Sequence, residues 1–146
     1  MNHNRDYIET TYPELKTSYI ECDDGWMPHI NKITDILVKE VTRYNALKGT
    51  NIVFVINQIK EKYGGLRYYI AFNNTSGADN DFITRLHKYV WDMEYVSTHI
   101  CEKCGMYGET RKLGGWYKTV CDTCYDELCP KDEEEDKPID TGVDNG

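Results

Sequence analysis

The chain has 146 residues, of which 40% are hydrophobic, and a formal net charge of −8. This length suits one compact domain with a small appendage. No segment approaches the roughly 18 consecutive apolar residues that span a bilayer, so we expect no membrane partner.

The chain before residue 50 is predicted to be a polar N-terminal segment followed by a long helix. Residues 1 to 25 are polar and fit a short helix or irregular structure. From Trp26 to Leu47, apolar residues recur at steps of three and four, the spacing of a helix with one buried stripe. Gly49 is a plausible stop for this helix.

A β-hairpin and a second helix are predicted next. The β-branched run Ile52 to Ile56 is typical of a strand buried on both faces, and Leu66 to Phe72 alternates like a second strand. Residues 58–65 contain a glycine pair and would join the two strands as an antiparallel hairpin. A helix with an apolar stripe then runs from about Asp81 to His99. These elements predict an α+β fold.

Four cysteines form the strongest chemical signal. Cys101 and Cys104 are separated by two residues, as are Cys121 and Cys124, with sixteen residues between the pairs. Two such turns present four thiolates to one tetrahedral zinc ion. A shell of four thiolates leaves no open position for catalysis, so we expect a structural Zn²⁺.

The residues around the cysteines suggest a small lobe. Gly105 permits a tight knuckle after the first pair, residues 111–120 suggest a hairpin, and residues 122–128 have helical character. A knuckle, a hairpin and a ligand pair at a helix start resemble the treble-clef class of zinc fingers. We therefore predict a body at 1–98, a zinc lobe at 99–129 and an acidic, disordered tail at 130–146. Replacing Cys104 or Cys121 with serine should unfold this lobe and leave much of the α+β body intact.

Basic residues suggest two further candidate sites. The first surrounds a glycine turn that could receive a phosphate or another anion, and comprises Lys60, Lys62, Tyr63, Gly64, Gly65 and Arg67. The simpler interpretation, which we prefer, is a hairpin turn with solvated ends. The second lies on the predicted zinc hairpin, where nucleic acid could bind, and comprises Arg111, Lys112, Trp116 and Lys118.

Two motifs together resemble a known family. The segment from Gln58 to Tyr69 contains IKEK-aromatic-GGLR-aromatic-Tyr, and residues 101–124 contain CExCG, GW and CDxC. The pair is similar to a family of small uncharacterised proteins from bacteriophages and prophages. The resemblance implies an accessory protein acting in the cytoplasm of the bacterial host, and no family activity accompanies it.

From the sequence we expect a protein that acts by binding a partner, not by catalysis. No catalytic arrangement is visible, so we expect no enzyme. We expect a zinc-containing phage-type protein that binds a host macromolecule, in the specific form of inhibiting a bacterial defence or regulatory system. Exposed aromatics would serve as anchors, for instance Tyr63, Tyr69, Trp116 and Tyr117. The alternatives are a nucleic-acid-binding zinc finger and a binder of a small phosphorylated ligand.

Overall fold

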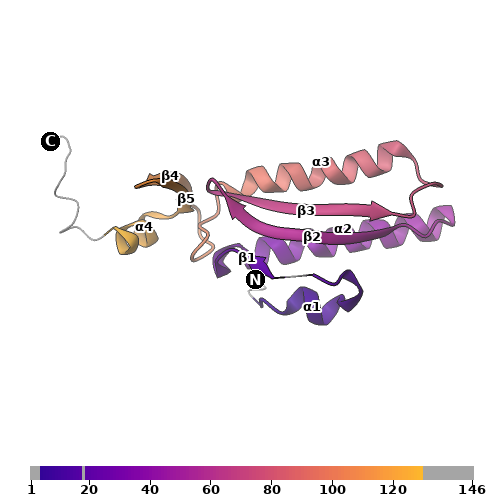
Figure 1. The fold of residues 1–146 in the computed structure, drawn as a ribbon, viewed down its shortest axis with the longest axis horizontal. Helices are drawn as coiled ribbons and strands as arrows, with labels where there is room; N and C mark the ends of the chain where they lie inside the picture. The colour runs from indigo at the N-terminus through magenta and orange to yellow at the C-terminus, as the bar shows by residue number, and fades with distance from the viewer. Residues whose placement is uncertain (1–3, 18, 130–146) are drawn as a thin grey trace.

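The computed structural model describes residues 4–17 and 19–129, so the predicted tail at 130–146 lies outside the described residues. Figure 1 shows an elongated molecule in which two long helices accompany a hairpin, with a small lobe at one end. The elements are α1 (Tyr7–Thr11), η1 (Pro13–Leu15), β1 (Ile20–Glu21), η2 (Asp24–Trp26), α2 (Met27–Lys48), β2 (Val53–Lys62), β3 (Gly65–Asn73), α3 (Asn80–Ser97), β4 (Glu109–Leu113), β5 (Trp116–Val120) and α4 (Asp122–Leu128). The predicted α+β class is confirmed.

Helix α2 follows the predicted stripe over most of its length. Its buried face includes Ile30, Ile33, Leu37 and Val41. The prediction was wrong at Leu47, whose side chain is 73% exposed, because the helix there extends past the sheet that covers its earlier turns. Gly49 ends the helix with φ +68°, a left-handed conformation that costs glycine little.

Strands β2 and β3 form a longer hairpin than predicted. Their pairing runs from Val53 opposite Asn73 to Lys62 opposite Gly65, so much of the predicted connection is strand. Only two residues form the turn, and both have positive φ, as a type I′ turn requires: Tyr63 at 55° and Gly64 at 85°.

The hairpin is buried on one face, not on both. Val53 is 50% exposed and Tyr69 is 40% exposed, whereas Phe54 and Tyr68 are buried. Both long helices cover the buried face. Tyr68 shares a 2.5 Å hydroxyl contact with Thr34 of α2, and Phe72 packs edge-on against His87 of α3. The apolar run at 52–56 therefore alternates between core and solvent.

The hairpin has a neighbour on each side. The short β1 pairs in parallel with β2 through Ile20–Ile59 and Glu21–Lys60, which makes a three-stranded sheet. On the opposite edge, the amide of Leu66 donates to the hydroxyl of Ser97, and the amide of Tyr68 donates to the carboxylate of Glu94. Side chains of α3 thus satisfy edge amides that a further strand would otherwise pair.

Helix α3 also departs from its predicted stripe at its end. Phe82, Leu86 and Val90 are buried as predicted, but Val96 is 37% exposed. Among the described residues, neither this helix nor any other is long and apolar enough to cross a membrane.

Candidate metal centre and adjoining groove

The four predicted ligands lie together. The sulfur atoms of Cys101, Cys104, Cys121 and Cys124 are all within 4.8 Å of one another. None of the four forms a disulfide. The Cys104 and Cys121 sulfurs are 3.7 Å apart, far beyond the ~2.05 Å of a disulfide bond. This cluster can hold a metal ion.

Local backbone structure aims the sulfurs at a common point. In the first knuckle, the amide of Gly105 donates to the carbonyl of Cys101 at 2.9 Å, and Gly105 has φ +87°. In the second, Cys121 precedes α4 and its sulfur accepts the amide of Cys124 at 3.4 Å. The order of knuckle, β4–β5 hairpin and helix start agrees with the sequence prediction.

The electrostatics of the site favour at least one thiolate. Burial alone would raise the pKa of Cys101, but backbone amides of Cys121, Cys104 and Lys103 outweigh it and lower that pKa to about 7. The pKa of Cys124 is raised, first by burial and then by the neighbouring thiols. Opposed shifts in adjacent thiols are the expected result when like charges crowd together, and a divalent cation would relieve that crowding.

The donor set suits zinc in chemistry and size. Four thiolates at ~2.3 Å from a tetrahedral zinc ion would be separated by roughly 3.8 Å, and the Cys104–Cys121 separation of 3.7 Å agrees. The remaining cysteines, Cys22 and Cys129, lie outside the cluster. Burial is the main cause of a raised pKa of about 12 for the Cys22 thiol, so this thiol stays protonated at neutral pH.

A buried ion pair joins the knuckle to the N-terminal part of the chain. Glu102 is 2% exposed. Its carboxylate accepts from the Lys118 ammonium at 3.0 Å and from the Asp23 amide at 3.0 Å, and Lys118 also contacts the Asp23 carboxylate at 3.1 Å. Burial raises the pKa of Glu102 although both partners oppose that shift. For Lys118, burial lowers the pKa, and the two carboxylates more than compensate and raise it.

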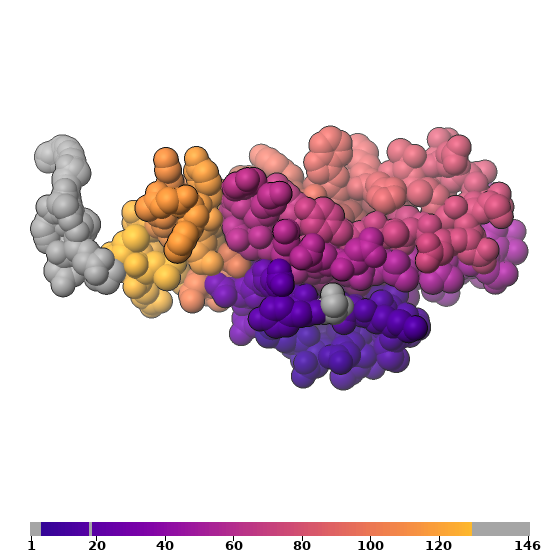
Figure 2. All heavy atoms as spheres, viewed as in Figure 1, coloured from indigo at the N-terminus to yellow at the C-terminus, as the bar shows by residue number. Residues whose placement is uncertain are grey.

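Two glycines let backbones meet at this junction. The Gly25 amide donates to the Glu102 carbonyl at 2.7 Å, and a Cβ on Gly25 would lie 2.3 Å from the Cys101 carbonyl oxygen. The Gly64 carbonyl accepts from the Thr119 hydroxyl at 2.6 Å. The tip of the β2–β3 hairpin and η2, just before α2, therefore both touch the lobe formed by residues 99–129, which is called the metal lobe below (Figure 2).

The predicted nucleic-acid residues are mostly engaged within the molecule. Lys118 is held by Glu102 and Asp23. Arg111 pairs with Asp122 at 2.6 Å and lies 4.8 Å from the centre of the Tyr125 ring. Of the three predicted cations, only Lys112 makes no ion pair among the described residues. The β4–β5 hairpin therefore does not present a basic row.

The glycine turn that was predicted as a possible anion site already has an internal hydrogen-bond partner. The Glu61 carboxylate accepts the Gly64 amide at 2.8 Å, where a phosphate would have to bind. Lys60 and Arg67 lie opposite each other on the outer sheet face, and Lys62 lies 5.5 Å from the Tyr63 ring centre. Gly65 starts β3 and is buried.

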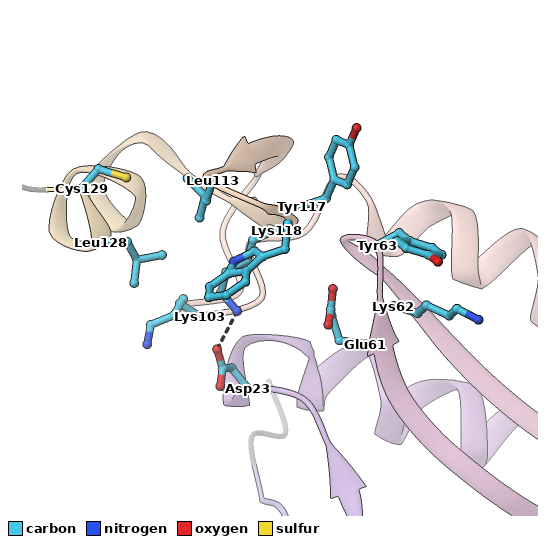
Figure 3. Close-up of a pocket in the computed structure, with 11 residues that line it drawn as sticks. Asp23, Glu61, Lys62, Tyr63, Lys103, Leu113, Tyr117, Lys118, Leu128 and Cys129 are labelled. Carbon is cyan, nitrogen blue, oxygen red and sulfur yellow. Dashed lines mark hydrogen bonds and ion pairs between the residues drawn. The ribbon is translucent and has the colours of Figure 1, made fainter. Parts of the chain in front are cut away.

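A groove of about 750 Å³ lies between the hairpin tip and the metal lobe. Figure 3 shows Glu61, Lys62 and Tyr63 on one side of it, with Leu113, Leu128 and Cys129 on the other. The groove is also lined by Asp23, Lys103, Trp116, Tyr117 and Lys118. Three of the four predicted aromatic anchors therefore line one groove, and the fourth, Tyr69, does not.

Sequence reasoning missed several features of this end of the molecule. Helix α3 presents Trp91, 73% exposed, and Tyr95, 67% exposed, and the Tyr95 ring lies 5.4 Å from His99. His99 in turn lies 6.1 Å from Tyr107. The spacing of residues 91, 95 and 99 was an available signal, because residues four apart share a helix face. No comparable signal marked Glu102, whose partner Lys118 is sixteen residues away.

Comparisons with protein-family models, curated proteins and solved structures find no match to this chain.

Proposed function

We propose that this chain is a non-enzymatic, zinc-containing accessory protein of bacteriophage type that binds a host protein in the bacterial cytoplasm and inhibits a defence or regulatory system. The observation that supports it is the aromatic groove between the hairpin tip and the metal lobe. Trp116 is 67% exposed and Tyr63 is 71% exposed. Tryptophan and tyrosine are enriched among the residues that dominate binding energy at protein interfaces.

The backbone at Tyr63 adds independent support. Its φ of 55° is a left-handed conformation that is uncommon for a bulky residue, and asparagine or glycine is preferred at this position of a type I′ turn. The exposed ring makes no core contact that would offset the strain. Strained residues cluster at functional sites, so an aromatic kept at this turn suggests that its ring is needed for binding.

The metal has a supporting role in this proposal. Zn²⁺ held by Cys101, Cys104, Cys121 and Cys124 would fix the treble-clef-like lobe, because that lobe has little apolar core of its own. The lobe carries Trp116 and Tyr117, whereas the hairpin carries Tyr63. The ion would therefore fix the position of the lobe's side of the groove relative to the hairpin's side, and it would take no part in chemistry.

Capture from bacterial lysate tests the proposal. Tagged protein should retain one stoichiometric host protein after nuclease treatment, and Trp116→Ala should lose it. Trp91→Ala is the matched control, because Trp91 is also largely exposed but lies outside the groove. Binding that disappears with nuclease would favour the nucleic-acid alternative, and equal loss in both variants would remove the groove from the account.

A further inference from the structure

The three-stranded sheet has one face that no other described element covers. Both long helices pack on its buried face. Figure 2 shows β2 and β3 at the near surface of the molecule, between the N-terminal segment and α3. The side chains that point outward from these two strands are half-buried or exposed. This face is therefore accessible to a partner.

A β-bulge places two adjacent amide side chains on this face. Ile56 and Ile59 are both buried although they are three residues apart, because the pairing with β3 shifts between Ile56 and Gln58. Asn57 and Gln58 therefore both lie outside the core, and Gln58 is opposite Tyr69, which is 40% exposed. Amide groups can hydrogen-bond the edge of a nucleobase while an aromatic ring stacks on its face.

Two cations face each other one step further along the same face. Lys60 and Arg67 are directly opposite in the pairing of β2 with β3, and neither forms an ion pair with any described residue. Like charges in this position repel each other, so an anionic partner would relieve an unfavourable contact. Arg67 and Tyr69 are about 6.8 Å apart along the strand, a distance that one nucleotide can span from its phosphate to its base.

The carboxylates around this face do not balance its cations. Glu21 lies beside Lys60 in the parallel pairing of β1 with β2. Glu61 lines the groove instead, whereas Lys62 points away from the groove (Figure 3). The Glu94 carboxylate lies at the edge of β3, where it accepts a backbone amide. Even when Glu94 is included, the cations of this face exceed its carboxylates.

We propose that this sheet face binds a single-stranded nucleic acid. Its binding surface, called the open face below, comprises Asn57, Gln58, Lys60, Arg67 and Tyr69. The two cations would contact phosphates, and the tyrosine ring would stack on a base. Because the bases of a duplex are already stacked on their neighbours, the ring requires an unpaired strand. Lysine is depleted at protein interfaces, which disfavours a protein partner here. The open face is separate from the aromatic groove, so this inference does not depend on the proposed function.

Fluorescence anisotropy with the full chain tests the proposal. The probes are labelled oligo(dT) and oligo(U) of about 20 nucleotides, longer than the ~4–16 nucleotides that one single-strand-binding fold covers, and a duplex of the same length. Because the chain has a net charge of −8, attraction is confined to the open face and binding should be modest. Two phosphate contacts, at a slope of about −0.7 each, predict about sevenfold weaker binding between about 50 and about 200 mM salt.

Matched variants assign binding to the open face. Lys60→Gln combined with Arg67→Gln should weaken binding severalfold and flatten its salt dependence. Removing this like-charge pair should not lower the melting temperature, so the loss would not reflect unfolding. Lys39→Gln combined with Lys48→Gln makes the same charge change on α2 and should have little effect, because α2 packs on the other side of the sheet. Tyr69→Ala should weaken binding about tenfold, whereas Tyr69→Phe keeps the ring and should bind normally.

Three results would overturn the proposal: no saturable binding of either oligonucleotide at about 50 mM salt, a duplex that binds as tightly as the single strands, or equal losses in the two double variants. Capture of an acidic host protein that requires Lys60 and Arg67, while neither oligonucleotide binds, would also overturn it. The relative affinity of oligo(U) and oligo(dT) identifies the strand as RNA or DNA, and either preference supports the proposal. Trp116→Ala should leave oligonucleotide binding unchanged, so the groove and the open face are tested separately.

Discussion

The α+β body and the metal lobe differ in the size of the hydrophobic core that stabilises each of them. The body has a core cluster of eighteen buried residues around α2 and the sheet, whereas the lobe's own cluster has three, two of which are Cys101 and Cys124 of the four-cysteine cluster. Hydrophobic burial explains the first and cannot explain the second. The contrast indicates that so small a core is not sufficient for the lobe, which has two further sources of stability: its contacts with the body, chiefly through Glu102 and Gly25, and a metal ion that its four cysteines could hold.

Metal loss should have the largest effect on this contrast. Binding of structural zinc contributes ~10–16 kcal/mol in small zinc-finger peptides, so Cys104→Ser should unfold β4, β5 and α4. Because the knuckle packs on Gly25 and Glu102 contacts Asp23, we expect the melting temperature of the body to fall as well, in contrast to the independent lobe expected from sequence.

Metal content and melting curves check this prediction. Cys129→Ser is the control and should keep one zinc equivalent, since Cys129 lies outside the cluster. A Cys104→Ser protein with full zinc content and an unchanged melting curve would show that the site is wrong.

A core truncation should affect the body through a different mechanism. Leu37 is fully buried, so Leu37→Ala should lower the free energy of unfolding by about 2–5 kcal/mol through lost burial and a cavity. Leu47→Ala, on the same helix but 73% exposed, should change it by less than about 0.5 kcal/mol. Urea unfolding at fixed zinc measures both, and similar losses would mean that Leu47 is covered in solution.

The junction is tested by adding one methyl group. Gly25→Ala would place a Cβ 2.3 Å from the Cys101 carbonyl oxygen, so the backbones must separate. We expect a loss of about 1–3 kcal/mol and weaker zinc retention against a chelator. Gly115→Ala is the matched control, because a Cβ there meets nothing within 4 Å. Unchanged zinc retention in Gly25→Ala would show that the knuckle does not need this contact.

The smallest effect should be a gain in stability. Tyr63→Asn suits the type I′ turn better and should stabilise the chain by about 1 kcal/mol, the lower end of the cost of a left-handed conformation. If the Tyr63 ring is an anchor, host capture should decrease in the same variant. A variant that is less stable would show that the ring contributes more to folding than to binding.

Local signals in the sequence identified most elements and the four-cysteine cluster that can hold a metal ion. Both long helices and the hairpin follow from apolar periodicity, and the spacing of the two cysteine pairs predicts that the four sulfurs lie together. The errors occurred where burial depends on partners distant in sequence. Val53 looked buried within an apolar run, yet its side of the sheet has no cover. Lys118 looked like a nucleic-acid contact, yet it is held by Glu102 and Asp23.

The sequence by itself determined the α+β class, the paired cysteines and the presence of an antiparallel hairpin with a glycine-containing turn, because helix periodicity, cysteine spacing and turn chemistry act over a few neighbouring residues. Only the tertiary structure decided that the hairpin tip and the metal lobe face each other across an aromatic groove. It also decided which charges are neutralised, since Asp23, Glu102 and Lys118 meet only after the chain has folded. Such long-range contacts depend on how separate elements pack, and no local pattern encodes them.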